Sequence, residues 1–134
     1  MVFNNIKLCA CKHKDYPHKL YFSRTLINDG KDYGENAIEE MFVKEGYTVV
    51  HPEMFSFDEQ VQMLSTCTHF AATEGSISHN VVFTPRTEVV IIRKSNYINS
   101  YQVFINELAD VDVTYIDSNY TLVRTVPWCG PFFV

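Results

Sequence analysis

The stretch from His69 to Asn80, HFAATEGSISHN, starts as an apolar strand and breaks at a single glycine. Two serines, a histidine and an asparagine then precede the apolar run 81–83, VVF. A strand that ends in this way is either an ordinary strand-to-helix turn or a turn whose backbone amides hold a phosphate. Both interpretations predict an α/β protein, in which buried strands alternate with helices.

Alternation continues outward from this stretch in both directions. Short apolar runs predict five strands, at 19–24, 47–51, 69–73, 88–92 and 112–116. Helical spacing and the intervening lengths predict helices or helical turns at 35–46, 56–67, 76–83 and 97–109.

Local signals mark several helix ends. Gly46 suits the residue after a helix, and Ser56 with Glu59 forms the S-x-x-E capping box that opens one. On the last helix, the side chains that share one face are interpreted as a core stripe; they are Tyr97, Tyr101, Phe104 and Leu108.

Alternating strands and helices predict one Rossmann-like, doubly wound α/β domain with a five-stranded parallel sheet. Of the two common strand orders, we predict 2-1-3-4-5, because it sets Arg24 beside the loop 73–76 at a topological switch point. The expected organisation is an N-terminal arm at 1–18, the domain at 19–117 and an irregular tail at 118–134.

Composition restricts the function classes. The chain has 134 residues, a formal net charge of −5 and a pI near 5.4, which argues against a nucleic-acid binder. No apolar run predicts a membrane span or a signal peptide, so a cytoplasmic location is expected. Any anionic ligand must therefore be held locally, by backbone amides or a few cations.

The cysteines predict neither disulfides nor a metal site. Cys67 falls in an apolar stretch and is interpreted as a buried thiol. The arm carries Cys9, Cys11, His13 and His18, but the C-x-C spacing is shorter than zinc ligands usually have.

The glycine turn predicts an anion site at the carboxyl end of a central strand. The backbone amides of Gly75, Ser76 and Ile77 would point outward there, and Arg24 would add a two-pronged phosphate contact. Glu74 would then face away from phosphate, toward sugar hydroxyls.

From Tyr21 to about Tyr115 the sequence resembles the C-terminal part of glycosyltransferase family 61. The shared motifs occur in the family's order: Ser23-Arg24, Glu35, Gly46-Tyr47, Pro52-Glu53, Ser56, Glu59-Gln60, Gly75-Ser76, Asn80 and Val82-Phe83. Two positions depart from the pattern, since Gly34 stands where Asn is usual and Glu74 replaces the usual His.

The resemblance implies a metal-independent, inverting sugar transfer from a nucleotide-diphosphate donor, in capsular or other surface polysaccharide synthesis. It implies that this chain is the donor-binding half of a two-domain enzyme of GT-B type. The glycan acceptor would then need an N-terminal domain or a partner chain, and the isolated chain is expected to be inactive.

Candidate roles follow for eight residues. Glu74 and His79 are the catalytic candidates, and the substrate-binding candidates are Arg24, Gln60, Gly75, Ser76, Ile77 and Asn80. Structural roles stay open for Gln60, His79 and Asn80, and Arg93-Lys94 is either part of a phosphate path or a solvated strand end.

Two other function classes remain open from the residues. One is a non-catalytic nucleotide-sugar-binding or scaffold module, and the other is an unrelated α/β enzyme acting on a small phosphorylated metabolite. The first would bind a donor without turnover, whereas the second would turn over a phosphate ester unaided.

Overall fold

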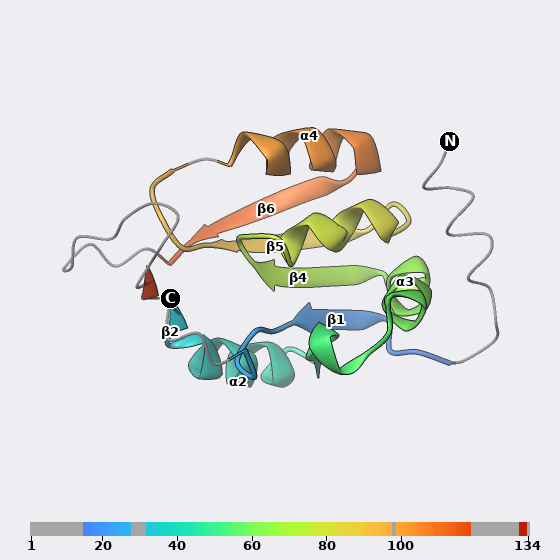
Figure 1. Ribbon diagram of the computed structural model, residues 1–134, viewed down its shortest axis with the longest axis horizontal. Helices are drawn as coiled ribbons and strands as arrows, with labels where there is room; N and C mark the ends of the chain where they lie inside the picture. The colour runs from blue at the N-terminus through green and yellow to red at the C-terminus, as the bar shows by residue number, and fades with distance from the viewer. Residues whose placement is uncertain (1–14, 28–31, 98, 119–131, 134) are drawn as a thin grey trace.

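The sheet of this protein is parallel throughout, in a computed structural model that describes residues 15–27, 32–97, 99–118 and 132–133 (Figure 1). Its strands, in spatial order, are β3 (Thr48–Val50), β1 (Lys19–Phe22), β4 (His69–Thr73), β5 (Glu88–Arg93) and β6 (Asp112–Asp117). Counted along the chain within this sheet, the order is 2-1-3-4-5, which confirms the predicted topology.

Helices fill the connections between the strands. They are α2 (Glu35–Lys44), the 3-10 turn η1 (Pro52–Met54), α3 (Phe57–Thr66), the 3-10 helix η2 (Ser78–Phe83) and α4 (Ser100–Ala109). The predicted capping box is confirmed, because Ser56 accepts from the amide of Glu59 and Glu59 returns the bond. Gly46 follows α2 with φ of 82°, a left-handed conformation that glycine adopts without strain.

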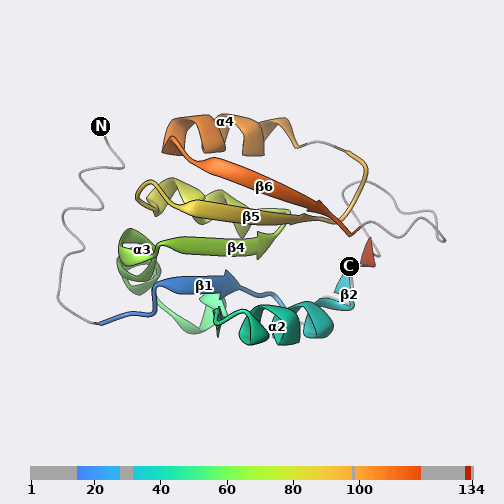
Figure 2. The same ribbon diagram turned by 180° about the vertical axis from the view of Figure 1, so that it is seen from behind.

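Strand alternation sorts the side chains into two layers of core. On one face Tyr21 packs with Phe42 and Ile38 of α2. On the other face Phe22 packs with side chains of α3 and η2. Figures 1 and 2 show α2 near the β1 end of the sheet, and α4 near the β6 end.

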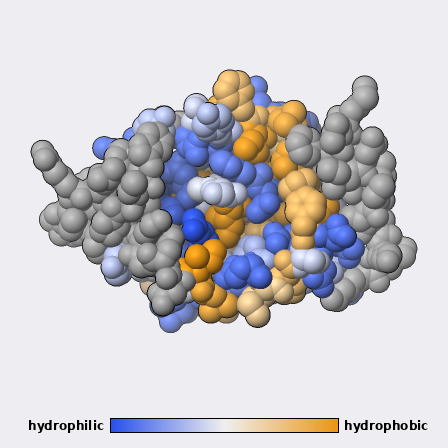
Figure 3. Space-filling view, in the orientation of Figure 1, coloured by the Kyte–Doolittle hydropathy of each residue, from blue (hydrophilic) through white to orange (hydrophobic). Residues whose placement is uncertain are grey.

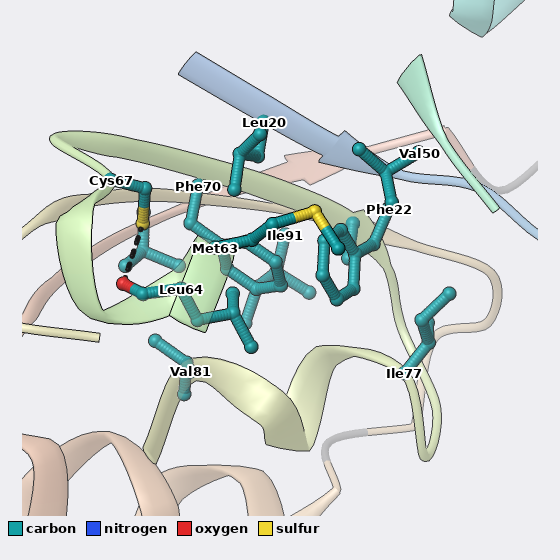
Figure 4. Close-up of a cluster of buried hydrophobic side chains, with 12 residues drawn as sticks. Leu20, Phe22, Val50, Met63, Leu64, Cys67, Phe70, Ile77, Val81 and Ile91 are labelled. Atoms are coloured by element: carbon teal, nitrogen blue, oxygen red, sulfur yellow. Dashed lines mark hydrogen bonds between the residues drawn. The ribbon is translucent and has the colours of Figure 1, made fainter. Parts of the chain in front are cut away.

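The larger core layer centres on α3 (Figure 4). Leu64 and Met63 of α3 face strand residues Phe22 and Phe70. Cys67 is fully buried there, and its thiol donates to the carbonyl of Leu64 at 3.2 Å. The prediction of a buried free thiol is therefore confirmed.

The predicted core stripe on α4 is wrong. Tyr101, Phe104 and Leu108 are 73%, 74% and 63% exposed, whereas Gln102 and Asn106 face inward. The inward residues form a hydrogen-bonded chain: the Gln102 amide donates to the Asn106 carbonyl oxygen at 2.8 Å, and Asn106 donates to the Tyr115 hydroxyl at 2.8 Å. Polar side chains can face a core when their hydrogen bonds are satisfied in this way.

A second, two-stranded parallel sheet joins β2 (Asp32–Tyr33) to β7 (Phe132–Phe133). The sequence predicted an irregular tail and missed this short pairing. The rest of the predicted tail beyond Ser118, and the arm residues Cys9, Cys11 and His13, lie outside the described residues. Within the described part, no helix is both long enough and apolar enough to cross a membrane.

Candidate functional site

The strands β1 and β4 lie side by side at the switch point of the sheet. The chain leaves β1 through α2 toward β3, on one side, and leaves β4 through η2 toward β5, on the other. In doubly wound sheets generally, connections that diverge in this way define a crevice beyond the carboxyl ends of the strands, and ligands bind there. Arg24 and the turn 74–77 both follow these two strands directly.

Arg24 and Gly75 come together at this edge. Gly75 has φ of 138°, and the position that a Cβ would occupy lies 3.8 Å from Nη1 of Arg24. Among the residues that the structure describes, that guanidinium nitrogen is the one atom found within 4 Å of this position, adjacent residues aside. The backbone of Gly75 is therefore open to close approach, with a guanidinium beside it, and the predicted proximity of the two residues is confirmed.

The amides of the turn are not equivalent. Gly75 donates its N–H to Oγ of Ser78 at 3.2 Å, so this amide is already engaged. The amides of Ser76 and Ile77 donate to no acceptor in the described part of the chain. Ser76 is exposed, whereas the side chain of Ile77 is buried in the core.

Ser78 anchors the turn to α4. Its hydroxyl lies 2.7 Å from the carbonyl oxygen of Gly75 and 2.6 Å from Oε1 of Gln102. Gln102 is 1% exposed and donates back to the carbonyl of Ser78 at 3.3 Å. The turn is thus held in place by α4, a helix that begins 22 residues further along the chain.

Glu35 closes the same edge from the α2 side. It is 3% exposed, and its Oε1 accepts from the hydroxyls of Tyr21 and Thr73, both at 3.0 Å. The same oxygen accepts from the amide of Arg24 at 3.2 Å. One carboxylate oxygen thereby joins β1, β4 and the loop after β1. Its second oxygen, Oε2, is buried and has no partner in the described part of the chain.

A second carboxylate supports the loop after β1. Glu39 lies one helical turn beyond Glu35, and its Oε1 accepts from the hydroxyls of Ser23 and Thr25, both at 2.5 Å. Ser23 is fully buried. Residues four apart share a face of a helix. Glu35 and Glu39 of α2 therefore bond to three consecutive residues, Ser23 to Thr25, and fix the loop on both sides of Arg24.

Burial governs the ionisation of Tyr21. Its pKa is raised well above the ordinary value, first because the hydroxyl is buried and second because the charge of Glu35 opposes a phenolate. Tyr21 therefore acts as a neutral donor to Glu35.

Glu74 follows β4 directly, and the polar groups that act on the pKa of its carboxyl belong to β5 and the loop after it. It is 8% exposed, and hydrogen bonding to the main chain of Lys94 and Asn99 acts to lower the pKa of its carboxyl. Burial raises the pKa of this carboxyl, and the hydrogen bonds and the charges of Arg93 and Lys94 only partly offset the effect. A carboxyl with a raised pKa is suited to accept a proton near neutral pH.

This raised pKa gives a testable pH dependence. Below the ordinary pKa, folded and unfolded chains both carry a protonated Glu74, so burial costs no charge desolvation. As the pH rises through the folded pKa, the stability from that carboxyl is lost. Glu74→Gln cannot ionise, so its free energy of unfolding should increase relative to the parent between about pH 4 and about pH 7.

Urea unfolding at both pH values measures this difference. Glu40→Gln, at an exposed position on α2, is the matched control and should change the stability difference less. An unchanged difference for Glu74→Gln between the two pH values would contradict the burial of a titrating carboxyl.

The other candidate residues make local contacts. Gln60 donates to the carbonyls of Pro52 at 2.8 Å and Phe55 at 3.1 Å, which ties η1 to α3. Asn80 donates to the carbonyl of Ile77 at 3.1 Å, within the turn. Burial lowers the pKa of His79, so its ring is neutral at neutral pH. Its Nε2 is buried without a partner in the described part of the chain.

The end of β5 is occupied by charged pairs and buried groups. Arg93 forms an ion pair with Asp117 of β6 at 2.8 Å, and Lys94 is 7% exposed. Neither residue is a freely solvated strand end. Both place positive charge near Glu74, on the side of β4 away from β1 and Arg24.

An open hollow of about 390 Å³ lies elsewhere, between α4 and β6. Arg86, Glu107 and Asp112 are among the residues that line it, and no predicted site residue does. The candidate functional groups lie instead at the switch point, where the guanidinium of Arg24 and buried carboxylates are close to the ends of β1 and β4.

One comparison with known proteins decides the family. Residues 4–91, more than half of the chain, match the family Glycosyltransferase 61. The chain belongs to glycosyltransferase family 61. The family match includes Arg24, Glu35 and the turn 74–80, and it ends within β5, before α4 and β6. No curated protein matches the chain.

Family 61 membership confirms the resemblance at the level of the family and of glycosyl transfer. Sequence reasoning named Glu35 as a motif residue but missed its role as the bridge between β1, β4 and Arg24. A glutamate directly after a helix-opening glycine, with a tyrosine in the preceding strand, was the available signal. Nothing local indicated the contact between Ser78 and Gln102, since the two are 24 residues apart.

Proposed function

We propose that this family 61 chain binds the diphosphate of a nucleotide-sugar donor in the crevice between β1 and β4. The observation that carries the proposal is the guanidinium of Arg24 beside the open backbone of Gly75. A guanidinium recognises phosphate oxygens with paired hydrogen bonds, and a glycine lets a ligand approach the main chain closely.

The amides of Ser76 and Ile77 are the remaining donors for the diphosphate. They lie in the same turn and donate to no other group in the described residues. The two amides and the Arg24 guanidinium would stabilise the negative charge of the diphosphate without a metal ion. The chain has a formal net charge of −5 and therefore repels an anion overall. An anionic ligand must be attracted by groups at the site itself, such as these.

The proposed reaction is an inverting transfer of a sugar to a glycan acceptor. Glu74 is the proposed general base, since burial raises its pKa. A neutral His79, with an unpartnered Nε2, is the second candidate for the same role. We place the acceptor on a further domain or partner chain, the process in capsular or other surface polysaccharide synthesis, and the protein in the cytoplasm.

One observation favours a non-catalytic, nucleotide-sugar-binding module as the second candidate. The side chain of Glu74 is 8% exposed, so its carboxylate has little access to an acceptor hydroxyl in this conformation. Such a module would bind donors with no turnover, even when an acceptor-binding partner is supplied.

Isothermal calorimetry with nucleoside diphosphates and nucleotide sugars tests donor binding. A ligand present at about 100 times its dissociation constant should also add about 2.7 kcal/mol of stability in thermal unfolding. Glu74→Gln should leave the affinity for a bare nucleoside diphosphate unchanged, because the proposed phosphate ligands are Arg24 and the amides of Ser76 and Ile77.

Gly75→Val should abolish nucleotide binding. A side chain at φ of 138° is strained, and its Cβ would occupy the space beside the Arg24 guanidinium. Gly46→Val is the matched control, because Gly46 also has a positive φ but no atom of the described residues lies within 4 Å of its Cβ position. Circular dichroism checks that both variants are folded. Parent-like binding by folded Gly75→Val would show that the loop is only a turn.

A further inference from the structure

Helix α4 is turned against the usual preference of an amphipathic helix. Tyr101 and Phe104 are 73% and 74% exposed, whereas the polar side chain of Gln102 is 1% exposed. In the space-filling view, hydrophobic residues reach the surface along the upper edge, where Figure 1 places α4 (Figure 3). Proteins break the hydrophobic pattern mainly at functional sites and compensate for it elsewhere. The inward polar face of α4 is therefore a candidate for a functional role.

Gln102 is the inward residue of α4 that contacts the turn of the proposed donor site. Its Oε1 lies 2.6 Å from the hydroxyl oxygen of Ser78, and its Nε2 donates to the carbonyl of Ser78 at 3.3 Å. The same Nε2 donates to Oδ1 of Asn106 at 2.8 Å. Because both ends of the buried amide are hydrogen-bonded, its position and orientation are fixed.

Ser78 connects Gln102 to the main chain of Gly75. The hydroxyl oxygen of Ser78 accepts from the amide of Gly75 at 3.2 Å and lies 2.7 Å from the Gly75 carbonyl oxygen. The next two amides, of Ser76 and Ile77, donate to no acceptor in the described residues. The position of the Ser78 hydroxyl therefore decides which amide of the turn is engaged internally and which amides are left for a ligand.

We infer that Gln102 is a positioning residue for the donor diphosphate, and that it acts through Ser78 on the turn 75–77. The inference rests on the proposed function, since it concerns the same amides. Gln102 is buried, so its influence passes through Ser78 rather than through contact with the ligand. Helix α4 is then part of the donor site, although Gln102 lies beyond the residues 4–91 that match the family.

A purely structural role for Gln102 has different consequences. Loss of its hydrogen bonds would lower the free energy of unfolding, as the loss of any buried hydrogen bond does. It would leave the nucleotide affinity of the folded chain unchanged, and it would not alter the Gly75 amide. Affinity and the exchange rate of that amide therefore separate the two roles.

Calorimetry with ADP, GDP, CDP and UDP measures the affinity of folded variants. Gln102→Leu, which keeps the size but loses the amide, should weaken nucleotide binding about 3- to 10-fold. Thr87→Val is the matched control, because it removes a buried hydroxyl that donates to the carbonyl of Cys67 at 3.1 Å. Thr87 precedes β5 at the amino edge of the sheet, so this control should bind nucleotide as the parent does.

Ser78→Ala breaks the same connection from the side of the turn, so the test does not depend on whether Gln102→Leu folds. It should weaken binding at least as much as Gln102→Leu does. The double variant should bind no more weakly than Ser78→Ala alone, since residues that act through one another are not additive. Additive losses would overturn the action of Gln102 through Ser78.

Hydrogen exchange followed by NMR, without nucleotide, reports on the turn directly. The Gly75 amide should exchange severalfold faster in Gln102→Leu than in the parent or in Thr87→Val, because its acceptor is no longer held. An unchanged Gly75 amide in folded Gln102→Leu overturns the inference.

Failure of the inference can be distinguished from failure of the proposed function. A parent that binds nucleotide as tightly as folded Gln102→Leu overturns the inference and leaves the proposed function standing. A parent that binds none of the nucleotides overturns the proposed function, and the role of Gln102 in donor binding with it.

Discussion

Glu35→Ala is expected to lower the free energy of unfolding by about 3–5 kcal/mol, since a buried donor without a partner costs about 1–3 kcal/mol. The substitution removes the acceptor of three donors: the hydroxyls of Tyr21 and Thr73, and the amide of Arg24. The two hydroxyls lie 3.1 Å apart, so one can donate to the other, and two buried donors are left without an acceptor. These groups belong to two neighbouring strands and the loop after the first, so no single rearrangement satisfies all three. Urea unfolding, followed by circular dichroism, measures the loss.

Glu40→Ala is the control for Glu35→Ala. Glu40 lies on the same helix but is exposed, so its replacement should change stability by about 0.5 kcal/mol or less. Glu35→Gln retains one oxygen acceptor and should lose less stability than Glu35→Ala. Equal, small losses for Glu35→Ala and Glu40→Ala would show that the bridge between β1 and β4 does not stabilise the fold.

Arg24→Ala is expected to weaken the affinity for a nucleoside diphosphate about 10- to 150-fold, which corresponds to a charge-assisted contact of about 1.5–3 kcal/mol. The guanidinium stands beside Gly75, where the proposed diphosphate meets the main chain. The amide of Arg24 bonds to Glu35 whatever the side chain is, so the loop backbone should keep its position. Calorimetry measures the change in affinity.

Arg86→Ala is the matched control for charge. Arg86 is exposed and precedes β5, at the amino edge of the sheet, so its loss removes the same charge far from the crevice. It should bind nucleotide as the parent does. If Arg24→Ala binds as tightly as Arg86→Ala, Arg24 is not a phosphate ligand, and donor binding must be sought at another place on the chain.

Much of the fold could be read from local patterns, because local physics controls them. The capping box at Ser56 and Glu59 depends on bonds within one helical turn. Gly46 suits its left-handed conformation whatever surrounds it. Alternation of strands and helices requires a parallel sheet, and the proximity of Arg24 and Gly75 follows from its strand order.

The sequence by itself therefore determined the five strands of the main sheet and the helices between them, and it favoured one of two common strand orders, with the candidate site at the carboxyl ends of the strands. It did not indicate the short pairing of β2 with β7. Only the tertiary structure decided which way α4 faces and what Glu35 joins. Helical spacing shows that Tyr101 and Phe104 share a face, but not whether that face meets the core. The orientation of α4 depends on hydrogen bonds of Gln102 and Asn106 with groups in other elements. Hydrogen bonds between residues far apart in the chain produce no repeating pattern in the sequence, so the spacing could not reveal them.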